Sequence, residues 1–233
     1  RCSRDWSSDV CSSDLYFIAP VNGTVQLFTI AVNLKNEKAN IRQITNGNFD
    51  VKSIIGISGS KIFAERTDMN HAAEIFEIDI AGGNMKQISH INDEFYNKIR
   101  TGKIERRYFN ATDGEKLMSW IIFPPDFDST KKYPTLLYCQ GGPQSALTQF
   151  YSLRWNFQLM AAHGYIVVAP NRRGMPGYGV KWNEEISGDY GGQNMKDYLT
   201  AIDEMAKEPY VDKSRIGCVG ASYGGYSVYY LAG

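Results

Sequence analysis

The sequence of 233 residues predicts a mixed α/β protein, in which a β-rich part precedes a helix-covered parallel sheet. Three observations support this prediction. Residues 16–100 contain short, alternating apolar patterns separated by turn residues, which are typical of antiparallel strands. Residues 133–219 instead alternate continuous apolar runs with segments of helical period, as parallel strands buried on both faces do. Finally, a glycine-rich turn at residues 220–225 joins an apolar strand to a helix-compatible segment.

The composition argues against several broad classes of function. The 25 basic residues are balanced by 25 acidic ones and are dispersed, so we expect neither a nucleic-acid nor an anionic membrane partner. No apolar run approaches the roughly 20 residues that span a bilayer. The four cysteines lack metal-ligand spacing, and we expect no metal and no cofactor.

Residues 1–15 differ from the rest of the chain. They show neither a helical nor an alternating period, and they lack the apolar core of a signal peptide. The run of residues 5–15 resembles a translated sequencing adapter. We therefore expect residues 1–15 to be an artefact outside the fold.

Residues 16–100 contain an internal repeat of about 45 residues. Its two copies align Phe28 with Phe76, Ile30 with Ile78, and residues 42–45 with residues 86–89. A unit of this length with about four strands is typical of a β-propeller blade, and a propeller closes with about four to eight blades. We expect the C-terminal blades of an incomplete propeller here, with a generic antiparallel meander as the alternative.

Residues 101–233 form the second expected domain. Its expected elements are a hairpin of residues 104–109 and 117–123, strands at 135–139, 165–170 and 215–219, and helices at 147–162 and 193–207. Apolar strands that alternate with helices in this order predict the N-terminal part of an α/β hydrolase domain.

The turn at residues 220–225 matches the nucleophile elbow Gly-x-Ser-x-Gly. In such an elbow, Ser222 adopts a strained backbone conformation that holds its hydroxyl clear of the sheet. We expect a Cβ at Gly220 or Gly224 to collide with neighbouring backbone, and Gly225 to allow close packing of the helix. A glycine-rich turn that carries a serine by chance is the alternative, but the strand before it and the helix after it favour a nucleophile.

Four segments together resemble the prolyl oligopeptidase family of serine peptidases. They are Gln-Gly-Gly-Pro at 140–143, the segments 171–179 and 188–192, and Gly-Ala-Ser-Tyr-Gly-Gly at 220–225. The resemblance covers residues 16–233, is strongest to the dipeptidyl-peptidase and acylaminoacyl-peptidase branch, and implies a β-propeller over an α/β hydrolase domain. Gln140 stands where the family more often has histidine. We expect this change to leave the role of the loop intact, since its chemistry is carried by main-chain N–H groups.

The resemblance implies a mechanism for three of these residues. Ser222 would attack the scissile carbonyl, and the N–H of Tyr223 would stabilise the resulting oxyanion. The resemblance adds Gly142 as the second donor of the oxyanion hole. An ordinary tight turn after a strand is the alternative for the Gly-Gly-Pro loop.

The catalytic acid and base are harder to assign, because hydrolases of this fold carry them after the serine in chain order. All three histidines precede Ser222. We therefore expect the acid and base to lie outside this polypeptide, which would then be inactive by itself. We assign no triad role to His71, His90, His163, Asp189 or Asp203.

The loop of residues 171–179 carries the adjacent pair Arg172 and Arg173 in a glycine-rich setting. Two interpretations stay open from the sequence. The arginines reach the substrate or the propeller, or they belong to a solvated surface loop.

The resemblance implies a serine peptidase that acts on oligopeptides and releases dipeptides or blocked residues. A carboxylesterase or lipase is an alternative, because the elbow alone does not separate amide from ester substrates. A non-catalytic, propeller-based binding protein is a third. The resemblance to bacterial relatives implies a periplasmic or secreted protein, and a homo-oligomer stays open.

Overall fold

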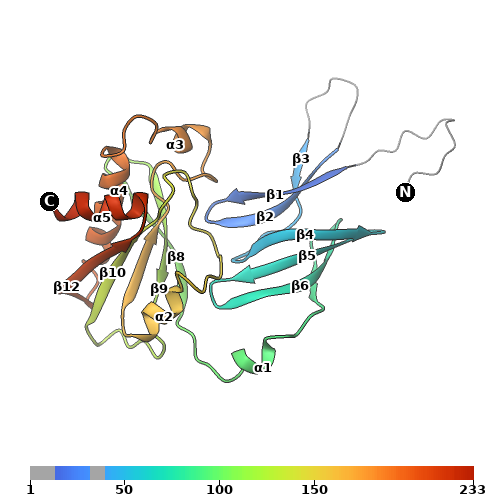
Figure 1. The fold of residues 1–233 in the computed structure, drawn as a ribbon, viewed down its shortest axis with the longest axis horizontal. Coiled ribbons are helices and arrows are strands. Elements are labelled where there is room, and N and C mark those ends of the chain that lie inside the picture. Colours follow the sequence, from blue (N-terminus) through green and yellow to red (C-terminus); the bar gives the residue numbers. More distant parts are fainter. Residues whose placement is uncertain (1–13, 32–39) are drawn as a thin grey trace.

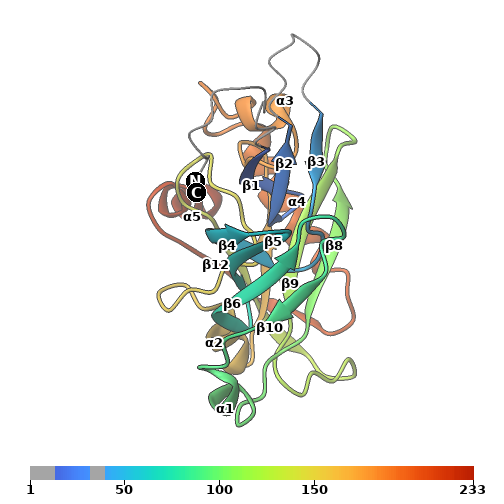
Figure 2. The same cartoon turned by 90° about the vertical axis from the view of Figure 1, so that its right-hand side faces the viewer.

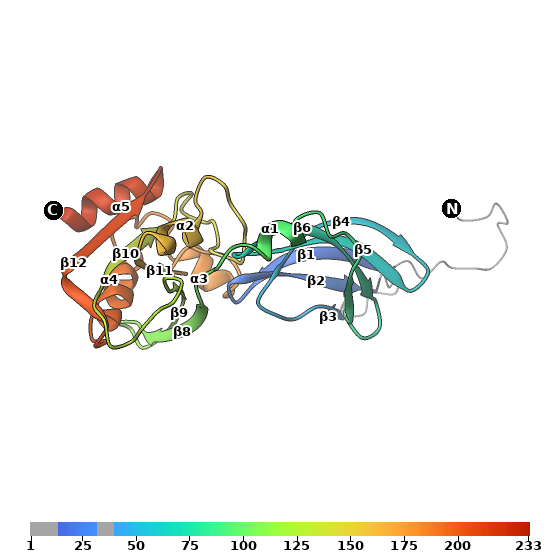
Figure 3. The ribbon, with the colours of Figure 1, turned by 90° about the horizontal axis from the view of Figure 1, so that it is seen from below.

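The computed structural model describes residues 14–31 and 40–233. The expectation that residues 1–15 are an artefact falls almost wholly outside the described residues, although Leu15 is the first residue of a strand. The molecule is elongated, with a helix-covered sheet at one end and purely antiparallel sheets at the other (Figures 1 and 3). Seen along the long axis, the antiparallel strands lie in front of the larger sheet (Figure 2).

Seven strands form two antiparallel sheets in the N-terminal part. The first sheet contains β1 (Leu15–Val21), β2 (Thr24–Ile30) and β3 (Ile41–Gln43). The second contains β4 (Asp50–Ser58), β5 (Lys61–Asp68), β6 (His71–Asp79) and β7 (Met85–Gln87). In each sheet the strands follow one another in chain order. Both sheets are therefore meanders, and their assignment to propeller blades stays a prediction.

The sequence repeat is also a repeat of strand register. Phe28 lies opposite Gln43 in the first sheet, and Phe76 lies opposite Gln87 in the second. These are the positions that the sequence alignment equates. The two sheets therefore end in the same pairing of a long strand with a short one.

The residues after each short strand repeat a hydrogen-bond pattern as well. The Thr45 hydroxyl accepts from the Leu27 N–H at 2.9 Å, and the Ser89 hydroxyl accepts from the Ile75 N–H at 2.8 Å. In both copies a glutamine amide two residues earlier donates to the carbonyl oxygen of this hydroxyl residue, at 2.7 and 2.8 Å. The hydroxyl thus satisfies a strand N–H beyond the end of the backbone ladder.

The C-terminal part is built on a five-stranded mixed sheet. Its strands are β8 (Ile104–Asn110), β9 (Lys116–Ile122), β10 (Tyr133–Cys139), β11 (Ile166–Pro170) and β12 (Val211–Gly220). The order across the sheet is β12-β10-β11-β9-β8. β10 pairs in parallel with both neighbours, whereas β9 is antiparallel to β8 and β11. The expected hairpin and parallel strands are confirmed.

Within residues 14–31 and 40–233, five helices accompany these sheets. They are α1 (Asp93–Tyr96), α2 (Phe157–Ala162), α3 (Val180–Glu184), α4 (Gln193–Met205) and α5 (Tyr223–Ala232). The short helices α1 and α3 were not expected from the sequence. No helix in the described part of the chain is long and apolar enough to cross a membrane.

Both faces of the sheet are buried at β9 and β11, as their apolar sequences predict. The expected burial is wrong for β12, an edge strand of the described sheet whose residues 213–217 are exposed. Leu117 and Ile121 of β9 pack on one face with Tyr198 of α4, and Trp120 packs on the other face with Phe157 of α2. All of these side chains are at most 3% exposed. Burial of an aliphatic or aromatic side chain of this size stabilises the fold by about 1.5–3 kcal/mol.

The helix expected at residues 147–162 is wrong for most of its length, because α2 begins only at Phe157. The preceding residues are held in an irregular path. The Thr148 hydroxyl and the Gln149 N–H both donate to the carboxylate of Asp50 in the other half of the molecule. Asn156 then caps α2, with its side chain accepting from the Leu159 N–H at 3.0 Å. The apolar period does not mark one buried helix face, because Leu153 is 86% exposed whereas Phe157 is buried.

The turn between β1 and β2 holds the antiparallel part against the mixed sheet. The Asn22 N–H donates to the Gly177 carbonyl oxygen at 3.1 Å, and the Trp120 indole donates to the Gly23 carbonyl oxygen at 3.1 Å. The Asn22 side chain also hydrogen-bonds the Tyr108 hydroxyl at 2.9 Å. The two parts of the chain therefore meet through specific polar contacts.

Asp50 is the buried centre of the same interface, at 4% exposure. Its Oδ1 accepts from the N–H groups of Val25 (2.8 Å) and Gln149 (3.1 Å), and its Oδ2 is 2.5 Å from the Thr148 hydroxyl oxygen. Burial raises the pKa of Asp50 to about 6. A protonated Asp50 keeps all three contacts, because Oδ2–H can donate to the hydroxyl oxygen of Thr148.

We predict that Asp50→Asn mimics this protonated carboxyl and is well tolerated. The folded-state pKa exceeds the ordinary value of 3.8, so protonation stabilises the native wild type below pH 4, and this stability is lost as the pH rises through about 6. The stability of the wild type relative to Asp50→Asn should therefore fall by about 2–3 kcal/mol between pH 4 and pH 7.5. Denaturant unfolding at the two pH values measures this difference.

Asp50→Ala serves as the comparison. Relative to Asp50→Asn, it leaves the N–H groups of Val25 and Gln149 without an acceptor, which costs about 1–3 kcal/mol at every pH. If the unfolding free energies of the wild type and Asp50→Asn changed equally between pH 4 and pH 7.5, the raised pKa of Asp50 would be contradicted.

Candidate active site

Ser222 lies at the sharp turn between β12 and α5. Its backbone has φ 59° and ψ −127°, a region that non-glycine residues rarely occupy and that costs about 1–3 kcal/mol. Two backbone hydrogen bonds hold the turn, from Gly224 N–H to the Ala221 carbonyl oxygen (2.9 Å) and from Tyr226 N–H to that of Ser222 (3.0 Å). Ser222 is exposed, so its hydroxyl is accessible from solvent.

Two glycines make this turn possible. A Cβ on Gly220 would lie 2.5 Å from the Cys139 carbonyl oxygen, and a Cβ on Gly224 would overlap the same atom. Real Cβ atoms do not approach backbone this closely, so only glycine fits either position. Gly225 differs, because its nearest neighbour would be the Gly220 carbonyl oxygen at 3.8 Å. The expectation that Gly225 is needed for close helix packing is wrong.

The Gly-Gly-Pro loop at residues 140–143 follows β10, the parallel neighbour of β12. Cys139 lies opposite Gly220 in the sheet, so the loop and the elbow begin at the same edge. A Cβ on Gly141 would lie 2.8 Å from the Ala221 carbonyl oxygen and 3.6 Å from the Ser222 Cβ. The loop therefore lies directly against the elbow, and the missing side chain of Gly141 permits this approach.

Two backbone amides beside Ser222 are available for a ligand. Across residues 14–31 and 40–233, the N–H groups of Gly142 and Tyr223 donate no hydrogen bond. Tyr223 is the first residue of α5, where N–H groups lack intrahelical partners and the helix dipole is positive. Such donors suit a negatively charged oxygen, and the oxyanion role of both residues stays a prediction.

The three histidines are engaged elsewhere. Their Nδ1 atoms contact groups of their own segments: His71 contacts Asp68 (2.8 Å), His90 contacts Asp93 (2.6 Å) and His163 contacts the Leu159 carbonyl oxygen (2.7 Å). His163 is the C-terminal cap of α2. Within the described ranges, the side chain of Ser222 has no hydrogen-bond partner, histidine or otherwise.

Cys139 lies close to the elbow but is not a second nucleophile. It is fully buried, and burial raises the pKa of its thiol to about 12, so the reactive thiolate is not populated near neutral pH. Cys218 is only partly buried, because β12 is an edge strand of the described sheet. Cys139 lies in β10 and Cys218 in β12.

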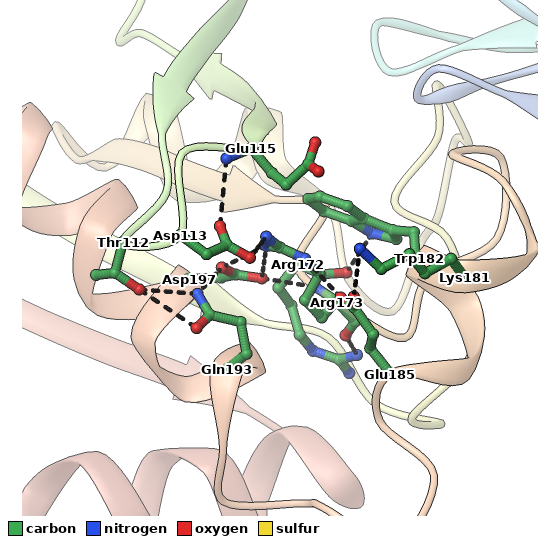
Figure 4. Close-up of polar contacts among 10 residues, drawn as sticks. All are labelled: Thr112, Asp113, Glu115, Arg172, Arg173, Lys181, Trp182, Glu185, Gln193 and Asp197. Atoms are coloured by element: carbon green, nitrogen blue, oxygen red, sulfur yellow. Dashed lines mark hydrogen bonds and ion pairs between the residues drawn. The ribbon is translucent and has the colours of Figure 1, made fainter.

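The interpretation of the arginine pair as part of a solvated surface loop is wrong, because Arg172 and Arg173 are 0% and 1% exposed. Figure 4 shows the carboxylates gathered around Arg173. Its guanidinium group contacts Asp197 (3.0 Å), Asp113 (2.5 Å) and Glu185 (2.9 Å) and stacks on the Trp182 ring (3.9 Å). Arg173 thus joins the β8–β9 turn, α3 and α4.

Arg172 is the residue near the site that the sequence did not reveal. Its Nη1 donates to the Pro143 carbonyl oxygen at 2.7 Å, and its guanidinium lies 4.8 Å from the ring centre of Tyr223. It therefore contacts both the loop and the elbow. The only sequence signal was a charged pair directly after a buried strand, and charge patterning alone places such a pair in solvent.

A pocket of about 540 Å³ adjoins the loop. It is lined by uncharged residues: Pro143, Gln144, Ile186, Ser187, Gly188 and Tyr190. The Tyr190 ring packs edge-on against Tyr223, at 5.3 Å between centroids. Pro143 and Gln144 thus form one wall of the pocket, and Tyr190, which packs against Tyr223, forms another.

We predict opposite effects for two adjacent glycine substitutions in α5. Gly224→Ala forces a Cβ onto the Cys139 carbonyl oxygen and should destabilise the fold by about 3 kcal/mol or more. Gly225→Ala meets only ordinary contacts within a helix and should be neutral or stabilising by up to about 1 kcal/mol. Thermal and denaturant unfolding compare the pair, and equal destabilisation by both would contradict the elbow geometry.

The chain resembles known peptidases over nearly its whole length. Residues 151–233 match the family model of the prolyl oligopeptidase family. Dipeptidyl-peptidase 5 of Porphyromonas endodontalis is 49% identical over 219 residues, covering 94% of this chain and 31% of that protein. The Porphyromonas gingivalis protein of the same name is 48% identical over 228 residues, covering 98% of this chain and 32% of that protein.

A solved structure agrees with these matches. The acylaminoacyl peptidase of Pyrococcus horikoshii superposes with a TM-score of 0.80 and 26% identity, covering 94% of this chain and 33% of that protein. The likeness therefore extends over the antiparallel sheets as well as the mixed sheet. The matches confirm what the motifs indicated: this chain is related to the prolyl oligopeptidase family of peptidases and spans about a third of the length of the relatives it matches.

Proposed function

We propose that the protein containing this chain is a serine peptidase that hydrolyses short peptides through an acyl-enzyme on Ser222. The observation that carries the proposal is an exposed serine in a strained turn, beside the unpartnered N–H groups of Gly142 and Tyr223. The relatives named dipeptidyl-peptidase 5 and acylaminoacyl peptidase support release of dipeptides or acylated residues.

The proposed reaction follows from these groups. The Ser222 oxygen attacks the scissile carbonyl carbon while its proton passes to a general base. The carbonyl oxygen becomes negative, and the N–H groups of Tyr223 and Gly142 would each stabilise it by about 3–4 kcal/mol. Collapse of the tetrahedral intermediate releases the amine and leaves an ester on Ser222, which water then hydrolyses.

We place the general base outside the described residues. His71, His90 and His163 each have a local partner, and none hydrogen-bonds Ser222. In hydrolases of this type the acid and the histidine follow the serine in the chain. A polypeptide limited to this sequence should therefore react slowly with fluorophosphonate probes that label activated serines.

The uncharged pocket beside the loop is our candidate for a substrate subsite. Pro143 and Gln144 directly follow Gly142, and Tyr190 packs against Tyr223, so both walls adjoin a proposed oxyanion donor. Its lining includes no charged side chain. We infer that it accepts an uncharged residue of the peptide close to the scissile bond.

We further infer that the two antiparallel sheets are blades of a β-propeller that restricts access to short peptides. The repeated register and the repeated hydroxyl contacts support this, because propeller blades are copies of one unit. The relatives are about three times as long as this chain, which leaves room for further blades.

Ser222→Ala in the full-length protein tests the peptidase function. Removing the nucleophile should lower kcat/KM on a dipeptidyl amide by a factor of about 10⁴ or more, and abolish fluorophosphonate labelling. Hydrolysis of short-chain esters but not of the amide by the wild type would instead favour the esterase alternative.

Ser214→Ala is the matched control. Ser214 is an exposed serine on the same strand, hydrogen-bonded to Asp212, and its loss should leave the rate within about twofold. Full amidase activity of Ser222→Ala, with the control also active, would remove the proposed function.

A further inference from the structure

We propose that Arg172 is a positioning residue that fixes the Gly-Gly-Pro loop against the nucleophile elbow. Its unpaired charge would also favour the negative oxygen that develops between them. The inference rests on the peptidase function proposed above and goes beyond it by assigning a role to a residue outside the elbow and the loop. Arg172 is fully buried, so every contact of its side chain is with protein.

Apart from Arg172 and Tyr198, the loop is held by the hydrogen bond from the Ser145 N–H to the Gly142 carbonyl oxygen (2.9 Å) and by packing of Gly141 on the elbow. Gly141 and Gly142 have no side chains, and Gly142 adopts φ +50°. Two donors of Arg172 reach the carbonyl oxygens on either side of these glycines, that of Pro143 at 2.7 Å and that of Gln140 at 3.5 Å. The guanidinium therefore bridges both ends of the glycine pair, which fixes the path of the backbone between them.

Tyr198 of α4 completes this support. Its hydroxyl accepts from the Arg172 Nε at 3.2 Å and from the Gln140 N–H at 3.0 Å. Tyr198 is fully buried, and burial raises the pKa of its hydroxyl, so it stays neutral and able to donate. Arg172 and Tyr198 together engage both the N–H and the carbonyl group of Gln140, which anchors the first residue of the loop.

Arg172 contacts the elbow through the ring that follows the nucleophile. Its guanidinium carbon lies 4.8 Å from the ring centre of Tyr223 and 5.6 Å from that of Tyr198, distances typical of cation–π contacts. The backbone N–H of Tyr223 is one proposed oxyanion donor, and the N–H of Gly142 is the other. The Arg172 side chain therefore contacts the ring of Tyr223, and it hydrogen-bonds backbone on both sides of Gly142.

Arg172 and Arg173 differ in whether a carboxylate pairs with their charge. Arg173 has three carboxylate partners, whereas no carboxylate in the described ranges forms an ion pair with Arg172. Burying a charge without an ionic partner lowers the stability of the folded state, so stability does not explain why Arg172 lies here. Next to the loop, however, the same charge favours an oxyanion, because the surroundings are buried and screening is weak.

The test compares Arg172→Met, Arg172→Lys and the wild type in the full-length protein. Methionine keeps an apolar stem but removes the charge and the donors. We expect kcat on a dipeptidyl amide to fall about 10- to 100-fold while KM changes less than about threefold. Lysine keeps the charge, so its kcat should lie between the two. Affinity for a peptide boronic acid, which mimics the tetrahedral intermediate, should fall in parallel with kcat/KM.

Arg66→Met is the matched control. Arg66 also stacks on two aromatic rings, those of Phe49 (4.3 Å) and Phe76 (4.7 Å), but it belongs to β5 in the antiparallel part. Its loss should leave kcat within about twofold. Hydrogen exchange gives a readout that needs no activity: the hydrogen-bonded amides of Gln140 and Ser145 should exchange at least about tenfold faster in Arg172→Met and at the wild-type rate in Arg66→Met.

The outcomes separate the two proposals. Loss of activity in Ser222→Ala together with a wild-type kcat in Arg172→Met would overturn the role of Arg172 and leave the peptidase function standing. Unchanged loop exchange in Arg172→Met would overturn it as well. Full activity of Ser222→Ala would remove the peptidase function, while the exchange measurement would still decide whether Arg172 positions the loop.

Discussion

The candidate site depends on one close approach of backbone, at the edge where β10 and β12 end side by side. The Cys139 carbonyl oxygen lies so near the elbow that a Cβ at Gly220 or Gly224 has no room. Because parallel neighbours end at the same edge, the loop after β10 and the turn after β12 meet there. The strained conformation of Ser222 persists because Gly220 before it and Gly224 after it are both packed against the Cys139 carbonyl oxygen.

Arg172 and Arg173 are adjacent and both buried, but their guanidinium groups have different kinds of partner. Arg173 is neutralised inside the protein by the buried Asp197, and it also pairs with the partly exposed Asp113 and Glu185, so it joins three elements (Figure 4). Arg172 is held instead by carbonyl oxygens and aromatic faces, which satisfy its donors but not its charge. Only the second arrangement leaves a positive charge beside the loop, where it can act on a ligand.

The sequence predicted those parts of the fold that depend on local pattern. The parallel strands, the β8–β9 hairpin, α4 and the strand–turn–helix around Ser222 follow from apolar period and glycine placement. The segment before α2 did not follow, because Thr148 and Gln149 bind Asp50, about a hundred residues earlier in the chain. The burial of Arg172 was hidden for the same reason: its partners come from the loop after β10, from α4 and from α5.

The loop of residues 171–179 connects the antiparallel part to the candidate site. At one end Arg172 supports the Gly-Gly-Pro loop, and five residues later Gly177 accepts a hydrogen bond from Asn22 in the β1–β2 turn. A Cβ on Gly177 would lie 3.2 Å from the Pro20 carbonyl carbon, so the two backbones are packed in close contact. A shift of the β1–β2 turn would therefore press on the segment that carries Arg172. The antiparallel sheets are thus joined by backbone contacts to the same segment that supports the Gly-Gly-Pro loop through Arg172.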